Sequence, residues 1–135
     1  MTRERLLILL LRLCAVCLLV ALVPAFMPFS WMMTIHRAIG LGELSETPLN
    51  QHLTRSLSAV YALQGALMLV VSFDVRRYWP IIRFLGWANV LLGAFLLALD
   101  HFAGLPLFWI LSEGPSVIAT GLLILWLTHG GAENR

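Results

Sequence analysis

The sequence contains four apolar runs separated by clusters of charged residues, at about 6–27, 55–73, 80–100 and 106–128. Each run is close to the roughly 20 residues that an α-helix needs to cross the hydrocarbon core of a bilayer. Only 12% of the 135 residues are charged, whereas a soluble domain averages about 25%. The sequence therefore predicts an all-α polytopic membrane protein, a bundle of four transmembrane helices that forms one domain over residues 1–135.

All nine basic residues are arginines, and the predicted spans divide them unevenly. With the N-terminus inside, the cytoplasmic side has seven of them: Arg3, Arg5, Arg12, Arg76, Arg77, Arg83 and Arg135. The outer side has Arg37 and Arg55. Because cytoplasmic loops carry such an excess of positive charge, we predict a multi-pass protein of a bacterial-type inner membrane with both termini in the cytoplasm. The charge is too sparse to indicate nucleic-acid binding.

The first apolar run also permits a second interpretation. Arg3 and Arg5 precede a leucine-rich stretch, and the Val-Pro-Ala sequence at 23–25 resembles a signal-peptide cleavage site. Cleavage would leave three spans and an external N-terminus. The length of the run favours a retained span.

The connection between the first two runs contains a segment, about 31–41, that is too apolar for a free loop and too short to span. Met32, Ile35 and Ile39 fall at helical spacing, and Trp31 precedes them. Tryptophan is enriched at the level of the lipid headgroups. We predict a short interfacial helix here, and a second span that starts at Thr47-Pro48, where threonine caps and proline occupies the first turn.

Small and polar residues repeat along one face of the second and third spans. Helices in a membrane associate through small residues and interhelical hydrogen bonds, so this face predicts a packing seam between the two spans. Its residues are Ser58, Tyr61, Gly65, Gly86, Asn89 and Gly93. Leu97 is expected to lie outside this seam and to face lipid.

The fourth run is interrupted by Glu113-Gly114-Pro115. Pro115 cannot donate a hydrogen bond to the carbonyl of Leu111, so the helix is expected to kink or open at Gly114 and Pro115. An ionisable residue within a span is costly and suggests a function. We predict that Glu113 faces Arg55 and Asp100 in a polar cluster near the outer surface, either as a structural ion pair or as a ligand or transport site.

Other reactive residues give weaker indications. Cys14 and Cys17 lie inside an apolar helix without a second thiol pair, which favours packing over redox chemistry. The spacing of His36, His52 and His101 matches no metal-ligand motif. The sequence therefore predicts no metal, no cofactor and no catalytic residue, and an enzyme is the least favoured interpretation.

Two local strings carry a resemblance: residues 72–78 (Ser-Phe-Asp-Val-Arg-Arg-Tyr), and residues 104–109 (Gly-Leu-Pro-Leu-Phe-Trp) leading to Glu113-Gly114-Pro115. Over about residues 31–127 the chain resembles a group of uncharacterised small bacterial inner-membrane proteins. Its overall plan is loosely similar to the DoxX-like four-helix family. This resemblance implies the four-helix architecture and no activity, cofactor or site residue.

The functional hypothesis is a structural or accessory membrane component, surrounded by membrane lipids and associated with a second copy of itself or with a partner membrane protein. The alternative is a small transporter or ligand-binding membrane protein that uses the polar cluster of Arg55, Asp100 and Glu113.

Overall fold

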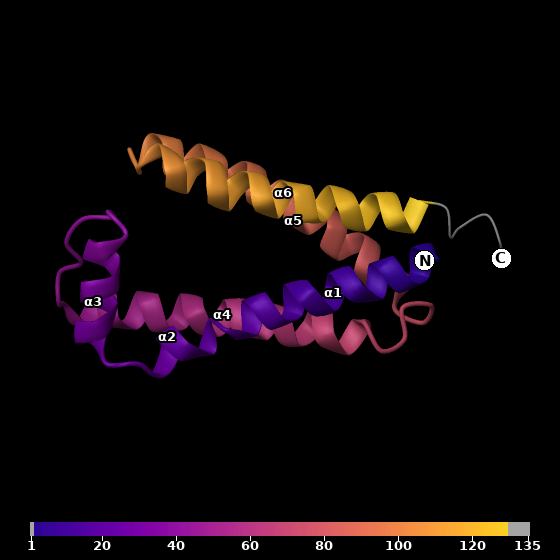
Figure 1. Cartoon of the computed structure of the whole chain (residues 1–135), viewed down its shortest axis with the longest axis horizontal. Coiled ribbons are helices and arrows are strands. Elements are labelled where there is room, and N and C mark those ends of the chain that lie inside the picture. Colours follow the sequence, from indigo (N-terminus) through magenta and orange to yellow (C-terminus); the bar gives the residue numbers. More distant parts are fainter. Residues whose placement is uncertain (1, 130–135) are drawn as a thin grey trace. The chain divides into compact units, whose positions relative to one another are not determined.

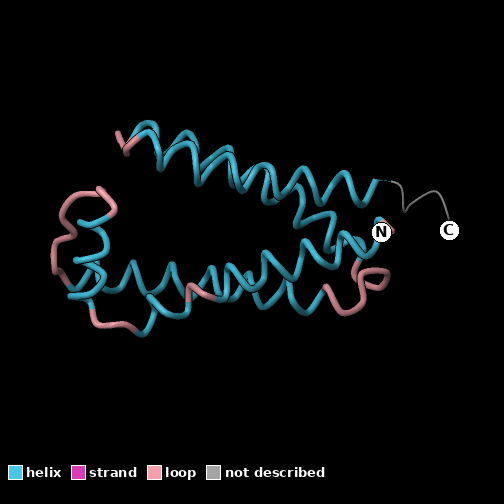
Figure 2. Tube along the Cα trace, viewed as in Figure 1, coloured by secondary structure: helices cyan, strands magenta, loops and turns pink. Residues whose placement is uncertain are grey.

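The computed structural model describes residues 2–129 of the chain, and within them it forms six helices and no strand (Figures 1 and 2). The helices are α1 (Arg3–Leu19), α2 (Leu22–Phe26), α3 (Phe29–Ala38), α4 (Pro48–Val71), α5 (Trp79–Phe102) and α6 (Leu107–His129). The predicted all-α class is confirmed. The polar C-terminal tail and Arg135, which contributes to the predicted topology, lie outside the described residues.

Four segments are long and apolar enough to cross a membrane: Arg3–Phe26, Pro48–Val71, Trp79–Phe102 and Leu107–His129. Exposed apolar side chains run along them at helical spacing. On α4 they are Leu49, Leu53, Leu57, Val60, Leu63, Leu67 and Val70, and on α5 they include Phe84, Trp87, Leu91, Phe95 and Phe102. Such continuous apolar surfaces suit lipid rather than water, which indicates a multi-pass membrane protein.

The first of these segments is not one regular helix, because α1 ends at Leu19 and α2 starts at Leu22. Pro24 has no backbone N–H to donate to the carbonyl of Val20, and the chain tightens there, with the N–H of Val23 donating to the Val20 oxygen at 2.9 Å. The first apolar run, predicted as a span at about 6–27, therefore consists of two helices separated by a turn.

Helix ends follow the local sequence closely. Thr47 caps α4, since its Oγ1 accepts a hydrogen bond from the N–H of Asn50 at 3.1 Å. At the C-terminal end of α5, Gly104 has a φ of +69°. The N–H of Gly104 donates to the carbonyl of His101, and the N–H of Leu105 donates to the carbonyl of Asp100. This arrangement is a Schellman motif. Gly40 ends α3 in the same way, so the short helix predicted for about 31–41 lies at Phe29–Ala38, and its interfacial position stays a prediction.

The chain forms two compact units, each of which is described by itself. Unit 1 comprises Met1–Leu10 and Val71–Arg135, and unit 2 comprises Leu11–Val70. In unit 2, a methyl group built on Gly65 would lie 2.9 Å from the carbonyl oxygen of Ala15 and 3.0 Å from the amide nitrogen of Leu19. Gly65 therefore allows the backbones of α4 and α1 to approach closely.

In unit 1, four glycines lie where the antiparallel helices α5 and α6 meet. A methyl group on Gly121 would be 2.6 Å from the carbonyl oxygen of Gly86, and one on Gly93 would be 2.8 Å from that of Gly114. The glycines are seven residues apart on each helix, or two helical turns, so they fall on one face. At Gly93, Gly114 and Gly121 a methyl group would meet the backbone of the other helix, so the absence of side chains there allows the two backbones to approach closely.

These contacts correct the predicted seam. The sequence placed Gly65, Gly86 and Gly93 between the second and third spans, but Gly65 lies against α1, and Gly86 and Gly93 lie against α6. Small residues identify a contact face without identifying the helix that packs on it, which explains the error. Leu97 was expected to face lipid, yet its Cβ would be 2.8 Å from a methyl group on Gly114, so it packs against α6.

Gly114 and Pro115 lie inside one continuous helix, because α6 extends from Leu107 to His129. The helix therefore does not open at these residues, and the predicted kink at Gly114 and Pro115 stays a prediction. Proline removes a single hydrogen bond, and the turns on either side keep theirs. Close packing of Gly114 against Gly93 and Leu97 of α5 holds this part of α6 in place.

The glycine contacts give a first prediction. Gly121→Ala should lower the free energy of unfolding by about 1–3 kcal/mol, because its methyl group meets the backbone of α5. Gly86→Ala is the matched control, since its methyl group meets the side chain of Leu125, which can rotate away. Both changes gain the same helix propensity. Thermal unfolding in detergent measures the difference, and equal losses would place the close contact elsewhere.

Candidate functional site

The polar side chains within α5 and α6 mainly bond to their own helices. Asn89 is buried, and its Nδ2 donates to the carbonyl oxygen of Leu85 at 2.7 Å. The hydroxyl of Thr128, also buried, donates to the carbonyl oxygen of Ile124 at 2.9 Å. The hydroxyls of Ser112, Ser116 and Thr120 donate to carbonyls three or four residues earlier. Such bonds satisfy part of the hydrogen-bonding capacity of polar residues in an apolar medium.

Asp100 differs from these residues. It lies in the last turn of α5, only 5% exposed, and its Oδ2 is a buried oxygen without a hydrogen-bond partner among the described residues. A carboxylate is also poorly placed at a helix C-terminus, where the helix dipole is negative. Burial and the helix dipole both make an unpaired negative charge unfavourable here. The position therefore favours the approach of a cation or of a hydrogen-bond donor.

Glu113 and Arg55 complete the predicted polar cluster. Glu113 is half-buried on α6, and its backbone oxygen accepts a hydrogen bond from the Ser116 hydroxyl at 2.9 Å. Arg55 is exposed on α4, which belongs to unit 2, whereas Asp100 and Glu113 belong to unit 1. The grouping of Arg55 with the two acids stays a prediction. On α4, the predicted seam residues Ser58 and Tyr61 are both half-buried.

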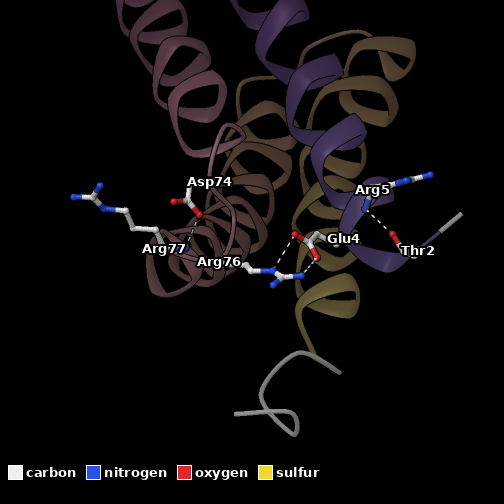
Figure 3. Close-up of polar contacts among 6 residues, drawn as sticks. All are labelled: Thr2, Glu4, Arg5, Asp74, Arg76 and Arg77. Atoms are coloured by element: carbon white, nitrogen blue, oxygen red, sulfur yellow. Dashed lines mark hydrogen bonds and ion pairs between the residues drawn. The ribbon is translucent and has the colours of Figure 1, made fainter.

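A second polar arrangement, which the sequence interpretation missed, lies where α1 and α5 begin (Figure 3). Arg76 binds both carboxylate oxygens of Glu4: Nε lies 3.2 Å from Oε1, and Nη2 lies 2.9 Å from Oε2. This hydrogen bond raises the pKa of the Arg76 guanidinium above its ordinary value. The two residues are 72 positions apart in the chain. The sequence offered one signal for this pair, which is that Glu4 lies between Arg3 and Arg5 in the first turn of α1.

Arginines at the same end of unit 1 also contact aromatic rings. The guanidinium of Arg3 lies 5.6 Å from the ring centre of Trp126 near the end of α6, and that of Arg77 lies 5.6 Å from the ring of Tyr78. Both are cation–π distances. The contact of Arg3 joins the start of α1 to the end of α6.

Unit 2 has polar contacts near the end of α3. Arg37 pairs with Glu43 at 3.0 Å, and Nδ1 of His36 lies 3.3 Å from the carbonyl oxygen of Gly42. Residues 2–129 contain no group of three or more His, Cys, Asp or Glu side chains arranged to hold a metal ion. Cys14 is half-buried and Cys17 is exposed, and neither is part of a disulfide.

No protein-family model, curated protein or solved structure matches this chain.

Asp100→Asn should raise the thermal stability of the purified protein, because it removes a charge from a buried position that offers no partner. Stabilisation of about 1 kcal/mol is expected, because an unsatisfied neutral amide is less costly when buried than an unsatisfied carboxylate. Asp74→Asn is the control: Oδ1 of Asp74 accepts the backbone N–H of Arg77 at 3.0 Å, so its loss should not stabilise. Unfolding followed by circular dichroism in detergent tests both, and destabilisation by Asp100→Asn would show that the carboxylate has a favourable partner.

Proposed function

We propose that this protein is a structural or accessory component of a bacterial-type inner membrane, held by four transmembrane helices, with both termini in the cytoplasm. One observation carries the structural role: five polar side chains of α5 and α6, those of Asn89, Ser112, Ser116, Thr120 and Thr128, each donate to a carbonyl of their own helix. These hydrogen bonds serve the helices themselves. The glycines of the same two helices serve close packing.

The outer surfaces of the helices support association with another membrane component. The exposed apolar residues of α4 continue over its whole length, from Leu49 to Val70, and Leu63 among them is 71% exposed. On α5, Phe84 and Leu91 are 68% and 69% exposed. Lipid satisfies such a surface, and so does the apolar face of a second copy or of a partner helix. The proposal therefore includes lipids and one of these protein neighbours.

Cross-linking in native membranes tests the proposed accessory role. A tagged chain should appear in one discrete larger species of fixed stoichiometry after cross-linking and mild detergent extraction. Mass spectrometry of that species would identify a second copy or a different membrane protein. Dilution of the membranes with excess lipid before cross-linking is the control for chance encounters. A chain that remains monomeric would contradict the accessory role.

The proposed topology rests on the arginines and has its own test. Single cysteines placed at Asp74 and at Ser45, in a background without Cys14 and Cys17, should differ in labelling by a membrane-impermeant maleimide in intact cells. The cysteine at position 45 should react and the cysteine at position 74 should not, because the arginine-rich turn is retained in the cytoplasm. Labelling of the cysteine at position 74 from outside would show that the proposed orientation is reversed.

A ligand-binding membrane protein is the second candidate, and the unpartnered Oδ2 of Asp100 favours it. A buried carboxylate at a helix C-terminus suits a small cation. Stabilisation of the wild-type protein by sodium or ammonium chloride, measured against choline chloride at equal ionic strength and absent in Asp100→Asn, would favour this function over the structural one.

A further inference from the structure

One end of unit 1 carries an excess of positive charge. Where α1 and α5 begin, the described residues bring five guanidinium groups together with two carboxylates, for a net charge of +3 in this part of the chain. The arginines are Arg3, Arg5, Arg76, Arg77 and Arg83, and the acids are Glu4 and Asp74. We call this set of residues the arginine end.

Both carboxylates are already engaged within the arginine end. Glu4 is held by Arg76 through two hydrogen bonds. Asp74 uses Oδ1 to accept the backbone N–H of Arg77, a bond that shapes the turn before α5. Neither acid is therefore directed at the side chain of Arg5, Arg77 or Arg83.

These three arginines are exposed, and no carboxylate among the described residues forms an ion pair with them. In Figure 3 the side chains of Arg5 and Arg77 extend away from the Glu4–Arg76 pair toward opposite sides. Their backbones take part in local hydrogen bonds: the N–H of Arg5 donates to Oγ1 of Thr2 at 3.4 Å, and the N–H of Arg77 donates to Oδ1 of Asp74 at 3.0 Å. The guanidinium groups of Arg5 and Arg77 thus point away from the Glu4–Arg76 pair.

Aromatic residues place the arginine end at the depth of lipid headgroups. Tyr78 and Trp79 lie at the start of α5, and Trp126 lies in the last turn of α6. Tyr and Trp are enriched where apolar helices leave the hydrocarbon core. Two of the rings have a guanidinium 5.6 Å from the ring centre, so Arg3 and Arg77 lie at the same level as these rings.

Phosphate is the anion available at that depth. A guanidinium binds phosphate oxygens through two parallel hydrogen bonds, and basic residues beside a membrane span are attracted to anionic lipids. A zwitterionic headgroup offers the same phosphate together with a cation that the arginines repel. Several outward arginines at one level therefore distinguish a negatively charged leaflet from a neutral one.

We propose that the arginine end is a docking surface for the headgroups of anionic phospholipids, with Arg5 and Arg77 as its main contacts and Arg83 as a third. The inference rests on the proposed membrane location and adds the class of lipid that the protein selects. Arg76 has a different role, because its guanidinium is used to hold Glu4 and so to join the start of α1 to the turn before α5.

The test reconstitutes the full chain in vesicles of equimolar phosphatidylcholine and phosphatidylglycerol, and counts by native mass spectrometry the lipids retained after mild detergent extraction. Wild-type protein should retain phosphatidylglycerol several-fold over phosphatidylcholine. R5Q/R77Q should lose more than half of this enrichment. R37Q/R55Q is the matched control in unit 2, outside the arginine end, with the same number of charges removed, and should keep it.

R5K/R77K keeps the charge and should keep most of the enrichment, which separates lipid selection from damage to the fold. Equal retention of both lipids by the wild type, full enrichment in R5Q/R77Q, or an equal loss in R37Q/R55Q would each overturn the proposal. So would stabilisation by inorganic phosphate, in pure phosphatidylcholine, that equals the effect of phosphatidylglycerol, because the ligand would then be a free anion. Failure of the proposed membrane location would differ visibly: the wild type would enter vesicles of neither composition.

Discussion

Contact between the backbones of α5 and α6 is the interaction on which unit 1 depends. Lipid provides no hydrophobic drive for helices to associate, so stability must come from close packing over many atoms. The pairs Gly86–Gly121 and Gly93–Gly114 permit this approach at two levels, two helical turns apart. Larger residues such as Leu97 and Leu125 then fill the space beside the glycines.

Hydropathy and local end signals predicted the fold well, because a membrane span must be long, apolar and internally hydrogen-bonded. Thr47 and Pro48 predicted the start of α4 correctly. The partners of the helices were predicted less well. The small residues of α4 and α5 indicated contact faces, but the glycine of α4 packs against α1 and those of α5 pack against α6. Pro115 also showed that one missing hydrogen bond does not open a well-packed helix.

The candidate site was predicted less completely, for reasons that lie in sequence distance and in local bonding. Asp100 was identified from its position near a helix end, but its burial and unpartnered Oδ2 depend on packing that no sequence pattern specifies. Asn89 looked like a link between helices, yet a hydrogen bond to the carbonyl of Leu85 within its own helix is also available to it. The Glu4–Arg76 pair joins residues 72 positions apart.

That pair has a consequence for the order in which the chain is assembled during synthesis. The first ten residues belong to unit 1, while the rest of α1 belongs to unit 2. Glu4 leaves the ribosome long before Arg76, and Arg3 long before Trp126. The remainder of α1 meets its partner α4 earlier. Unit 2 can therefore be completed while the chain is still growing, whereas the beginning of the chain must wait for its end before unit 1 can form.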